Sequence, residues 1–252
     1  ALWIADLYYW RIAFMIIPVL SIISLAIALL SIKKEEITAS ECFNINVLKN
    51  IFKQYWKLIK NFECVVYILI YAFATASYVV IFSNISIVFV HNDHIHQEVF
   101  SYFIIADSML YVLSSFLSIY IIVKKGIDYT KNLGFIIFMF GCFGLFVFSH
   151  LDSHNINIIL TFILIISFGS GLVTGFMLKA TSILPHMKGA ILSFSYVLIS
   201  LLSARKIYWT QVFFDNTIMP TSTVIFIGAS ILIILFSTVY YQKSKKGKLT
   251  LL

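Results

Sequence analysis

Long runs of apolar residues, separated by short polar clusters, follow one another along the whole chain. Runs such as 14–30 and 158–173 lack the polar residue at every second position that a strand of a membrane barrel shows. A helix needs roughly 20 mostly apolar residues to cross a hydrocarbon core about 30 Å thick. By this measure the sequence predicts seven membrane-spanning helices, at about 10–32, 64–90, 98–123, 132–150, 156–178, 189–214 and 221–241.

One long polar segment, 33–62, separates the first predicted span from the second. Between Val47 and Asn61, apolar residues recur at helical spacing with lysines on the other face. This pattern is typical of an amphipathic helix at a membrane surface, with Trp56 at the level of the headgroups, although a calmodulin target shares it. The predicted units are a first span (1–32), a cytoplasmic linker (33–62), a six-helix bundle (63–241) and a basic cytoplasmic tail (242–252).

The lysines indicate how the chain is oriented. They gather in the linker and after the third, fifth and seventh spans, whereas the opposite connections, 91–97 and 150–155, contain no Lys or Arg. Cytoplasmic loops carry the excess of Lys and Arg. Arg11, Arg205 and Lys206 lie near span ends, where long side chains can reach the interface as anchors. We therefore expect a multi-pass protein of the inner (plasma) membrane, with its amino end outside and its carboxy end in the cytoplasm.

Composition excludes a soluble domain. Hydrophobic residues make up 61% of the chain and charged residues 12%, against about 45–50% and about 25% in soluble proteins. The net charge of +7 arises from lysines beside apolar spans, so we expect membrane lipid rather than nucleic acid as the partner. The three cysteines have no metal-ligand spacing. We expect no metal and no cofactor.

Four segments carry a resemblance to a known family. Residues 9–14, Tyr-Trp-Arg-Ile-Ala-Phe, resemble the Trp-Arg-x-x-Phe sequence that opens the sixth helix of many major facilitator superfamily transporters. Residues 124–131 resemble the basic, glycine-bearing turn between helices eight and nine. The glycines of 169–175 resemble the glycine-rich tenth helix. Residues 184–193 resemble the turn and helix start of drug/proton antiporters.

The overall arrangement is most similar to the Bcr/CflA branch of drug-resistance proteins. This resemblance implies an all-α bundle that matches the carboxy-terminal half of the family, with 1–32 equivalent to helix six. It also implies proton-coupled multidrug efflux of a small-molecule substrate. Such transporters hold their substrate between two halves near the middle of the membrane. We therefore expect a truncated or split transporter, completed by a separately encoded amino-terminal half or by a second copy.

Asp107 is the clearest candidate for a substrate or proton pathway. It follows Glu98 by nine residues, so it lies about 14 Å along its span. An ionisable group at such a depth is costly and often marks a pathway. We expect Asp107 to titrate in the cavity or to pair with Arg205 or Lys206. A structural, hydrogen-bonded acid is the alternative.

Two further patterns have less specific meanings. Gly171 and Gly175 form a Gly-x-x-x-Gly pair, which indicates close helix packing and is compatible with a substrate passage beside a thin helix. The segment 91–96 holds three histidines and Asp93 at spacings that zinc sites use. We interpret this segment as a solvated loop.

The sequence contains none of the common hydrolase, metalloprotease or nucleotide-binding motifs, so we do not expect an enzyme. Besides transport, a non-transporting membrane relic or scaffold remains open. A seven-span receptor is disfavoured, because the long loop of this sequence would then follow the first span of the receptor. A reading frame upstream that encodes five further spans would favour the transporter.

Overall fold

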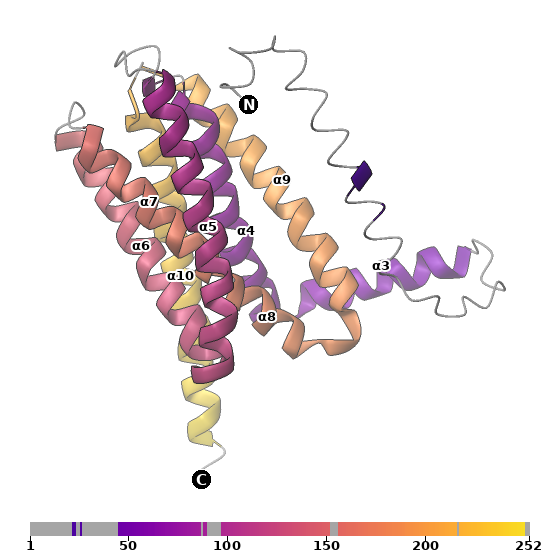
Figure 1. Ribbon diagram of the computed structural model, residues 1–252. Helices are drawn as coiled ribbons and strands as arrows, with labels where there is room; N and C mark the ends of the chain where they lie inside the picture. Colours follow the sequence, from indigo (N-terminus) through magenta and orange to yellow (C-terminus); the bar gives the residue numbers. More distant parts are fainter. Residues whose placement is uncertain are drawn as a thin grey trace.

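The computed structural model describes residues 45–86, 88–89, 97–151, 156–215 and 217–249, together with residues 22, 23 and 26. Throughout these residues the regular structure is helical (Figure 1). The elements are α3 (Ile45–Lys60), α4 (Phe62–Ser86), α5 (Gln97–Lys125), α6 (Ile127–Leu151), α7 (Ile156–Leu172), α8 (Thr174–Ile183), the short 3-10 helix η2 (Pro185–Met187), α9 (Lys188–Val212) and α10 (Met219–Leu249).

Six helical stretches in the described part of the chain are long and apolar enough to cross a membrane. They are Phe62–Ile85, Glu98–Lys125, Ile127–Leu151, Ile156–Ile183, Pro185–Val212 and Met219–Gln242. The predicted all-α membrane bundle is therefore confirmed, and its six later spans agree in order and position. The first predicted span, 10–32, lies almost entirely outside the described residues, as does the histidine-containing segment 91–96.

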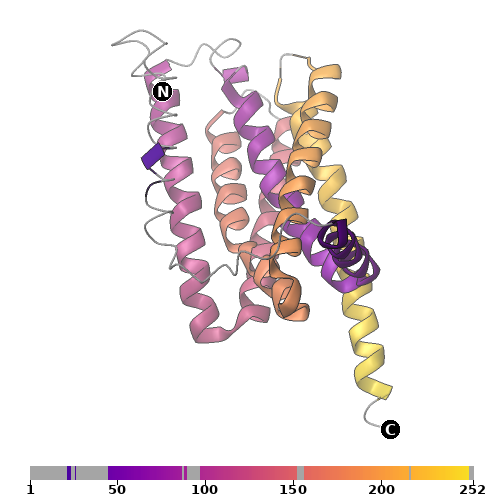
Figure 2. The ribbon, with the colours of Figure 1, turned by 90° about the vertical axis from the view of Figure 1, so that its right-hand side faces the viewer.

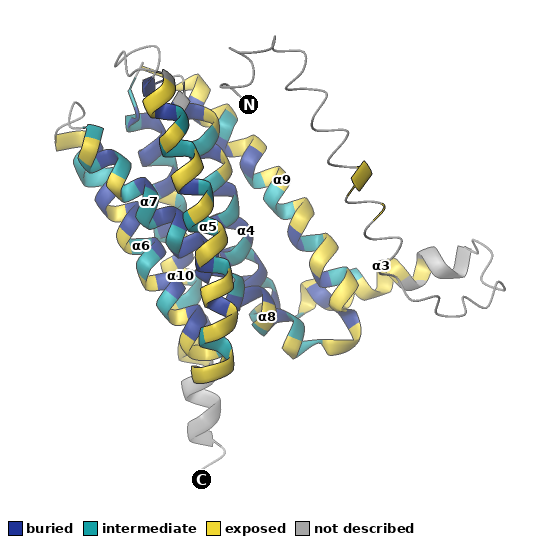
Figure 3. Ribbon diagram, viewed as in Figure 1, coloured by how far each residue is buried: buried dark blue, intermediate teal, exposed yellow. Residues whose placement is uncertain are grey.

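α4 is the most enclosed of the spanning helices. In its most apolar stretch 61% of the residues are buried, whereas the corresponding figure is 17% for both α5 and α9. α4 packs against α7, α8, α9 and α10, and the exposed residues of α5 and α9 run along the outside of the bundle (Figure 3). In a membrane, such apolar faces meet lipid or another protein.

Gly126 is the only residue between α5 and α6. Its φ of 86° lies in the left-handed region that favours glycine, and its N–H donates to the carbonyl of Ile122 at 2.9 Å. α6 then begins at Ile127, so its first turns are helical where the sequence predicted a connection up to residue 131. Asp128 and Lys131 therefore belong to a helix.

α3 projects sideways from the end of the bundle at which α4 begins (Figure 1), and Figure 2 views it nearly end-on while the long helices run lengthwise. Asn61 joins the two helices, and its side-chain oxygen accepts the Cys64 N–H at 3.1 Å, which caps α4. The Tyr55 hydroxyl lies 2.6 Å from Ser193 Oγ of α9. Trp56 stays 61% exposed, so one apolar edge of α3 is left uncovered.

The span Ile156–Ile183 is divided into α7 and α8 at Val173. The Thr174 hydroxyl donates to the carbonyl of Gly171 at 2.8 Å. Such a side-chain bond to the preceding turn competes with the regular helical pattern and bends a helix. The break gives α8 a direction of its own at the α3 end of the bundle.

Candidate functional site inside the bundle

Asp107 lies in α5 with 1% of its surface exposed. Ser167 of α7 donates a hydrogen bond to Asp107 Oδ1 at 2.5 Å. The side chain of Tyr78 of α4 also interacts electrostatically with this carboxyl group. The ion pairs between two described residues involve Asp128 and not Asp107, so the hydrogen-bond partner of Asp107 in the described part of the chain is the neutral hydroxyl of Ser167.

The contact between α5 and α7 depends on small residues. A Cβ on Gly171 would lie 1.8 Å from Ser114 Oγ and 2.8 Å from the carbonyl of Tyr111. One turn earlier on α7 is Ser167, the partner of Asp107. Gly171 thus permits the close approach that brings α7 within hydrogen-bonding distance of the acid.

Gly175 has a comparable position on α8. A Cβ there would lie 3.1 Å from the backbone nitrogen of Lys131 in α6. Gly171 and Gly175 therefore face different helices, α5 and α6. Close helix packing therefore accounts for both glycines of the Gly-x-x-x-Gly pair.

Lys206 of α9 points into the bundle and is 5% exposed. Its Nζ donates to Ser77 Oγ at 2.6 Å and to the carbonyl of Phe73 at 3.2 Å. The same nitrogen lies 3.2 Å from the centre of the Phe73 ring, within the range of a cation–π contact. The interpretation of Lys206 as an interfacial anchor is therefore wrong, because its ammonium group is enclosed between α9 and α4.

Arg205, the neighbour of Lys206, has the opposite orientation. Its side chain is exposed, and its guanidinium carbon lies 5.2 Å from the centre of the Trp209 ring. Neither Arg205 nor Lys206 forms an ion pair with Asp107 among the described residues. The structure thus places the three candidate ionisable residues in three different environments.

Further hydrogen bonds join the helices at the end away from α3. Asn84 Nδ2 of α4 donates to Thr210 Oγ1 of α9 at 2.9 Å and to Thr221 Oγ1 of α10 at 3.2 Å. Ser149 Oγ of α6 lies 2.6 Å from Ser222 Oγ of α10. All five residues are buried, so this end of the bundle has a polar interior.

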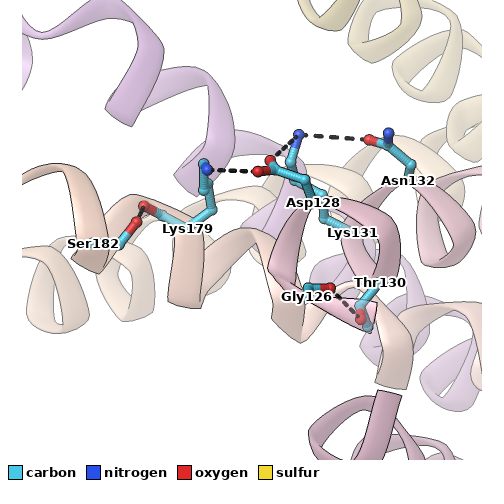
Figure 4. A network of polar contacts seen from close by, with 7 residues as sticks. All are labelled: Gly126, Asp128, Thr130, Lys131, Asn132, Lys179 and Ser182. Atoms are coloured by element: carbon cyan, nitrogen blue, oxygen red, sulfur yellow. Dashed lines mark hydrogen bonds and ion pairs between the residues drawn. The ribbon is translucent and has the colours of Figure 1, made fainter. Parts of the chain in front are cut away.

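Charged groups meet at the α3 end (Figure 4). Lys179 Nζ of α8 lies 2.8 Å from Asp128 Oδ2, and Lys131 Nζ lies 3.2 Å from Asp128 Oδ1. Asp128 thereby links α6 to α8.

A model of the Major Facilitator Superfamily matches residues 1–205 of the chain. The chain belongs to the major facilitator superfamily. The family that the sequence motifs indicated is thereby confirmed at the level of the superfamily. No curated protein and no solved structure matches the chain.

Membership of the major facilitator superfamily establishes the general function. This protein is a multi-pass membrane protein, and its family transports small molecules across membranes. Members of the family are transporters rather than enzymes, which agrees with the expectation from the motifs. Among the described residues no group of three His, Cys, Asp or Glu side chains is arranged to hold a metal ion.

Sequence reasoning missed several polar residues of this transporter chain. Ser77, Tyr78 and Ser167 are short or aromatic hydroxyl residues within apolar runs, and no sequence signal says which face of a buried helix they occupy. Lys131 falls in the predicted connection, because the apolar run of the next span starts only at residue 132. The apolar run that follows gave no indication that α6 begins before this residue.

Proposed function

We propose that this chain is the carboxy-terminal portion, from helix six onward, of a Bcr/CflA-like multidrug exporter driven by the proton gradient. Asp107 carries the proposal, because it is a buried carboxyl group between α4, α5 and α7. Its hydroxyl partner Ser167 and the nearby hydroxyl of Tyr78 can each donate or accept a hydrogen bond. The carboxyl group can therefore take up or release one proton without losing its neighbours.

The other candidate residues have supporting roles in this proposal. Gly171 and Gly175 keep the α7–α8 span close to α5 and α6 beside the pathway. Lys206 is a second ionisable group on the pathway, against the other flank of α4. Arg205 lies on the exposed face of α9, where it can meet substrate or a neighbouring protein.

The exposed faces of α5 and α9 support the presence of an amino-terminal half, encoded separately or upstream. Large apolar side chains are exposed on both helices, including Met109, Phe116, Tyr196 and Leu201. In this proposal the half packs against these faces and encloses a substrate cavity. The protein lies in the inner membrane with its lysine-rich end in the cytoplasm.

The same exposed faces also favour a second candidate function. A membrane scaffold would use α5 and α9 to bind another membrane protein without moving a substrate. It would not need Asp107 to change its protonation state. The two functions therefore differ in what they require of this one side chain.

Accumulation of a fluorescent cationic dye distinguishes the two functions. Cells would express the chain alone or together with an amino-terminal half, with and without an uncoupler. We expect uncoupler-sensitive dye exclusion only on co-expression, and its loss in Asp107→Asn. Glu98→Gln is the matched control, because it changes an exposed carboxylate on the same helix. Equal dye exclusion by Asp107→Asn and the control would refute the proton-carrying role, and absence of exclusion despite verified insertion would favour the scaffold.

A further inference from the structure

The ammonium group of Lys131 is enclosed by aromatic rings. Lys131 is 6% exposed, and its Nζ lies 5.1 Å from the ring centre of Tyr67, 5.8 Å from that of Phe176 and 5.5 Å from that of Phe236. The rings come from α4, α8 and α10, while Lys131 itself belongs to α6. We call Tyr67, Phe176 and Phe236 the aromatic cage.

The aromatic cage is held in place by its own ring contacts. Tyr67 and Phe176 have ring centres 5.6 Å apart, and Phe176 and Phe236 meet nearly edge to face at 5.7 Å. Asp128 supplies a carboxylate oxygen 3.2 Å from Lys131 Nζ (Figure 4). Aromatic faces together with a carboxylate are the groups by which proteins recognise alkylammonium ions.

The aromatic cage borders a pocket of about 260 Å³. Tyr67, Phe236, Asp128 and Lys131 all line this pocket, so the interior of the cage is reached through it. Asp128 is largely exposed and can meet a ligand that enters. The structure therefore contains both a recognition site for a cation and a way into it.

We propose that the aromatic cage and Asp128 form a binding site for an alkylammonium ion, and that the Lys131 ammonium occupies this site until an external cation displaces it. The long, flexible stem of a lysine allows its ammonium group to withdraw. Tyr67 and Tyr78 are separated by eleven positions on α4, about 16 Å along the helix. The site is thus distinct from the surroundings of Asp107.

An external cation binds more weakly if it must first displace the Lys131 ammonium from the aromatic cage. The measured affinity is the intrinsic affinity multiplied by the fraction of molecules in which the Lys131 ammonium has left the site. Lys131→Met keeps an unbranched apolar side chain but removes the competing charge. We therefore expect this variant to bind an alkylammonium ion at least ten times more tightly than the unmodified chain.

The test is calorimetric titration of the purified 252-residue chain in detergent with choline. Lys125→Met is the matched control, because Lys125 is exposed and its ammonium faces Tyr129, outside the aromatic cage. We expect tighter choline binding in Lys131→Met and no change in the control. Adding Phe236→Leu to Lys131→Met should abolish the gain, and 3,3-dimethylbutan-1-ol, which has the shape of choline without its charge, should not bind.

Equal choline affinity in Lys131→Met and Lys125→Met would overturn the proposal, as would equal binding of the neutral alcohol. If Lys131→Met fails to fold by circular dichroism, Phe236→Leu alone decides, because it must weaken choline binding by the unmodified chain about tenfold. An unchanged affinity there also overturns it. Binding in detergent requires no transport, so this result is independent of the dye assay.

Discussion

Ser77 and Tyr78 are consecutive residues of α4, and they bind ionisable side chains from two different helices. Ser77 Oγ lies 2.6 Å from Lys206 Nζ of α9, and Tyr78 interacts electrostatically with Asp107 of α5. Consecutive residues of a helix point about 100° apart. α4 therefore contacts an amine on one side and an acid on another, and a rotation of α4 would alter the surroundings of both.

Replacement of Lys206 by Met tests how the buried ammonium contributes to stability. Removing a buried charge without leaving a charged partner behind is often neutral or stabilising. We expect the free energy of unfolding of Lys206→Met to lie within about 1 kcal/mol of that of the unmodified chain, or above it. Ser77→Ala instead leaves the ammonium without its closest acceptor and should cost about 1–3 kcal/mol.

Thermal unfolding in detergent, monitored by circular dichroism, measures the stability of the Lys206→Met and Ser77→Ala variants. Arg205→Met serves as control, because Arg205 is the exposed neighbour on the same helix. A loss of stability in Lys206→Met larger than in Ser77→Ala would show that the charge itself holds α9 to α4.

Gly171→Ala should destabilise the contact between α5 and α7. The new methyl group would lie 2.8 Å from the backbone carbonyl oxygen of Tyr111, which cannot rotate away as Ser114 Oγ can, so the helices must shift apart, at a cost of about 1–3 kcal/mol. Gly189→Ala is the control, because nothing lies within 4 Å of a Cβ at that position of α9. It should gain about 0.5–1 kcal/mol of helix stability. Chemical unfolding followed by fluorescence compares the two variants, and equal effects would contradict the close contact.

Cys64 and Cys142 should resist modification in the folded chain. Both thiols are buried, and Cys64 Sγ lies 3.7 Å from the carbonyl of Ala180. In a Cys42→Ser background, a bulky maleimide should add no mass until detergent denaturation exposes both sites. A cysteine at the exposed position of Lys188 is the positive control. Labelling of Cys142 at the rate of that control would show that the bundle opens.

Trp56 should lie at the headgroup level of a bilayer. Its side chain is 61% exposed on the uncovered edge of α3, and amphipathic helices bury such an edge at the membrane boundary. With the other tryptophans changed to Phe, lipids brominated near the headgroup should quench Trp56 more strongly than lipids brominated near the chain end. Stronger quenching by aqueous iodide than by either lipid would place α3 in water.

The spanning helices could be predicted because an apolar run of span length has few alternatives in a membrane. The start of α6 was missed for a physical reason. Asp128 and Lys131 read as a loop, but Lys179 pairs with Asp128 and the aromatic cage encloses Lys131. These partners come from distant parts of the chain. Local hydropathy contains no information about them.

The candidate site was predicted in part. The position of Asp107 along its helix follows from helix geometry, whereas its burial against α7 depends on packing. The side of the helix on which Lys206 lies could not be predicted, because α9 is apolar on several faces. Its sequence is compatible with a lysine at the membrane interface and with one inside the bundle. Only the packing against Phe73 and Ser77 decides it.

The one-residue connection at Gly126 has a mechanical consequence. Because a single residue connects Lys125 to Ile127, α5 and α6 cannot slide past each other at this end of the helical hairpin. A displacement of the end of α5 must therefore be followed by the start of α6, where Asp128 is paired with Lys179 of α8.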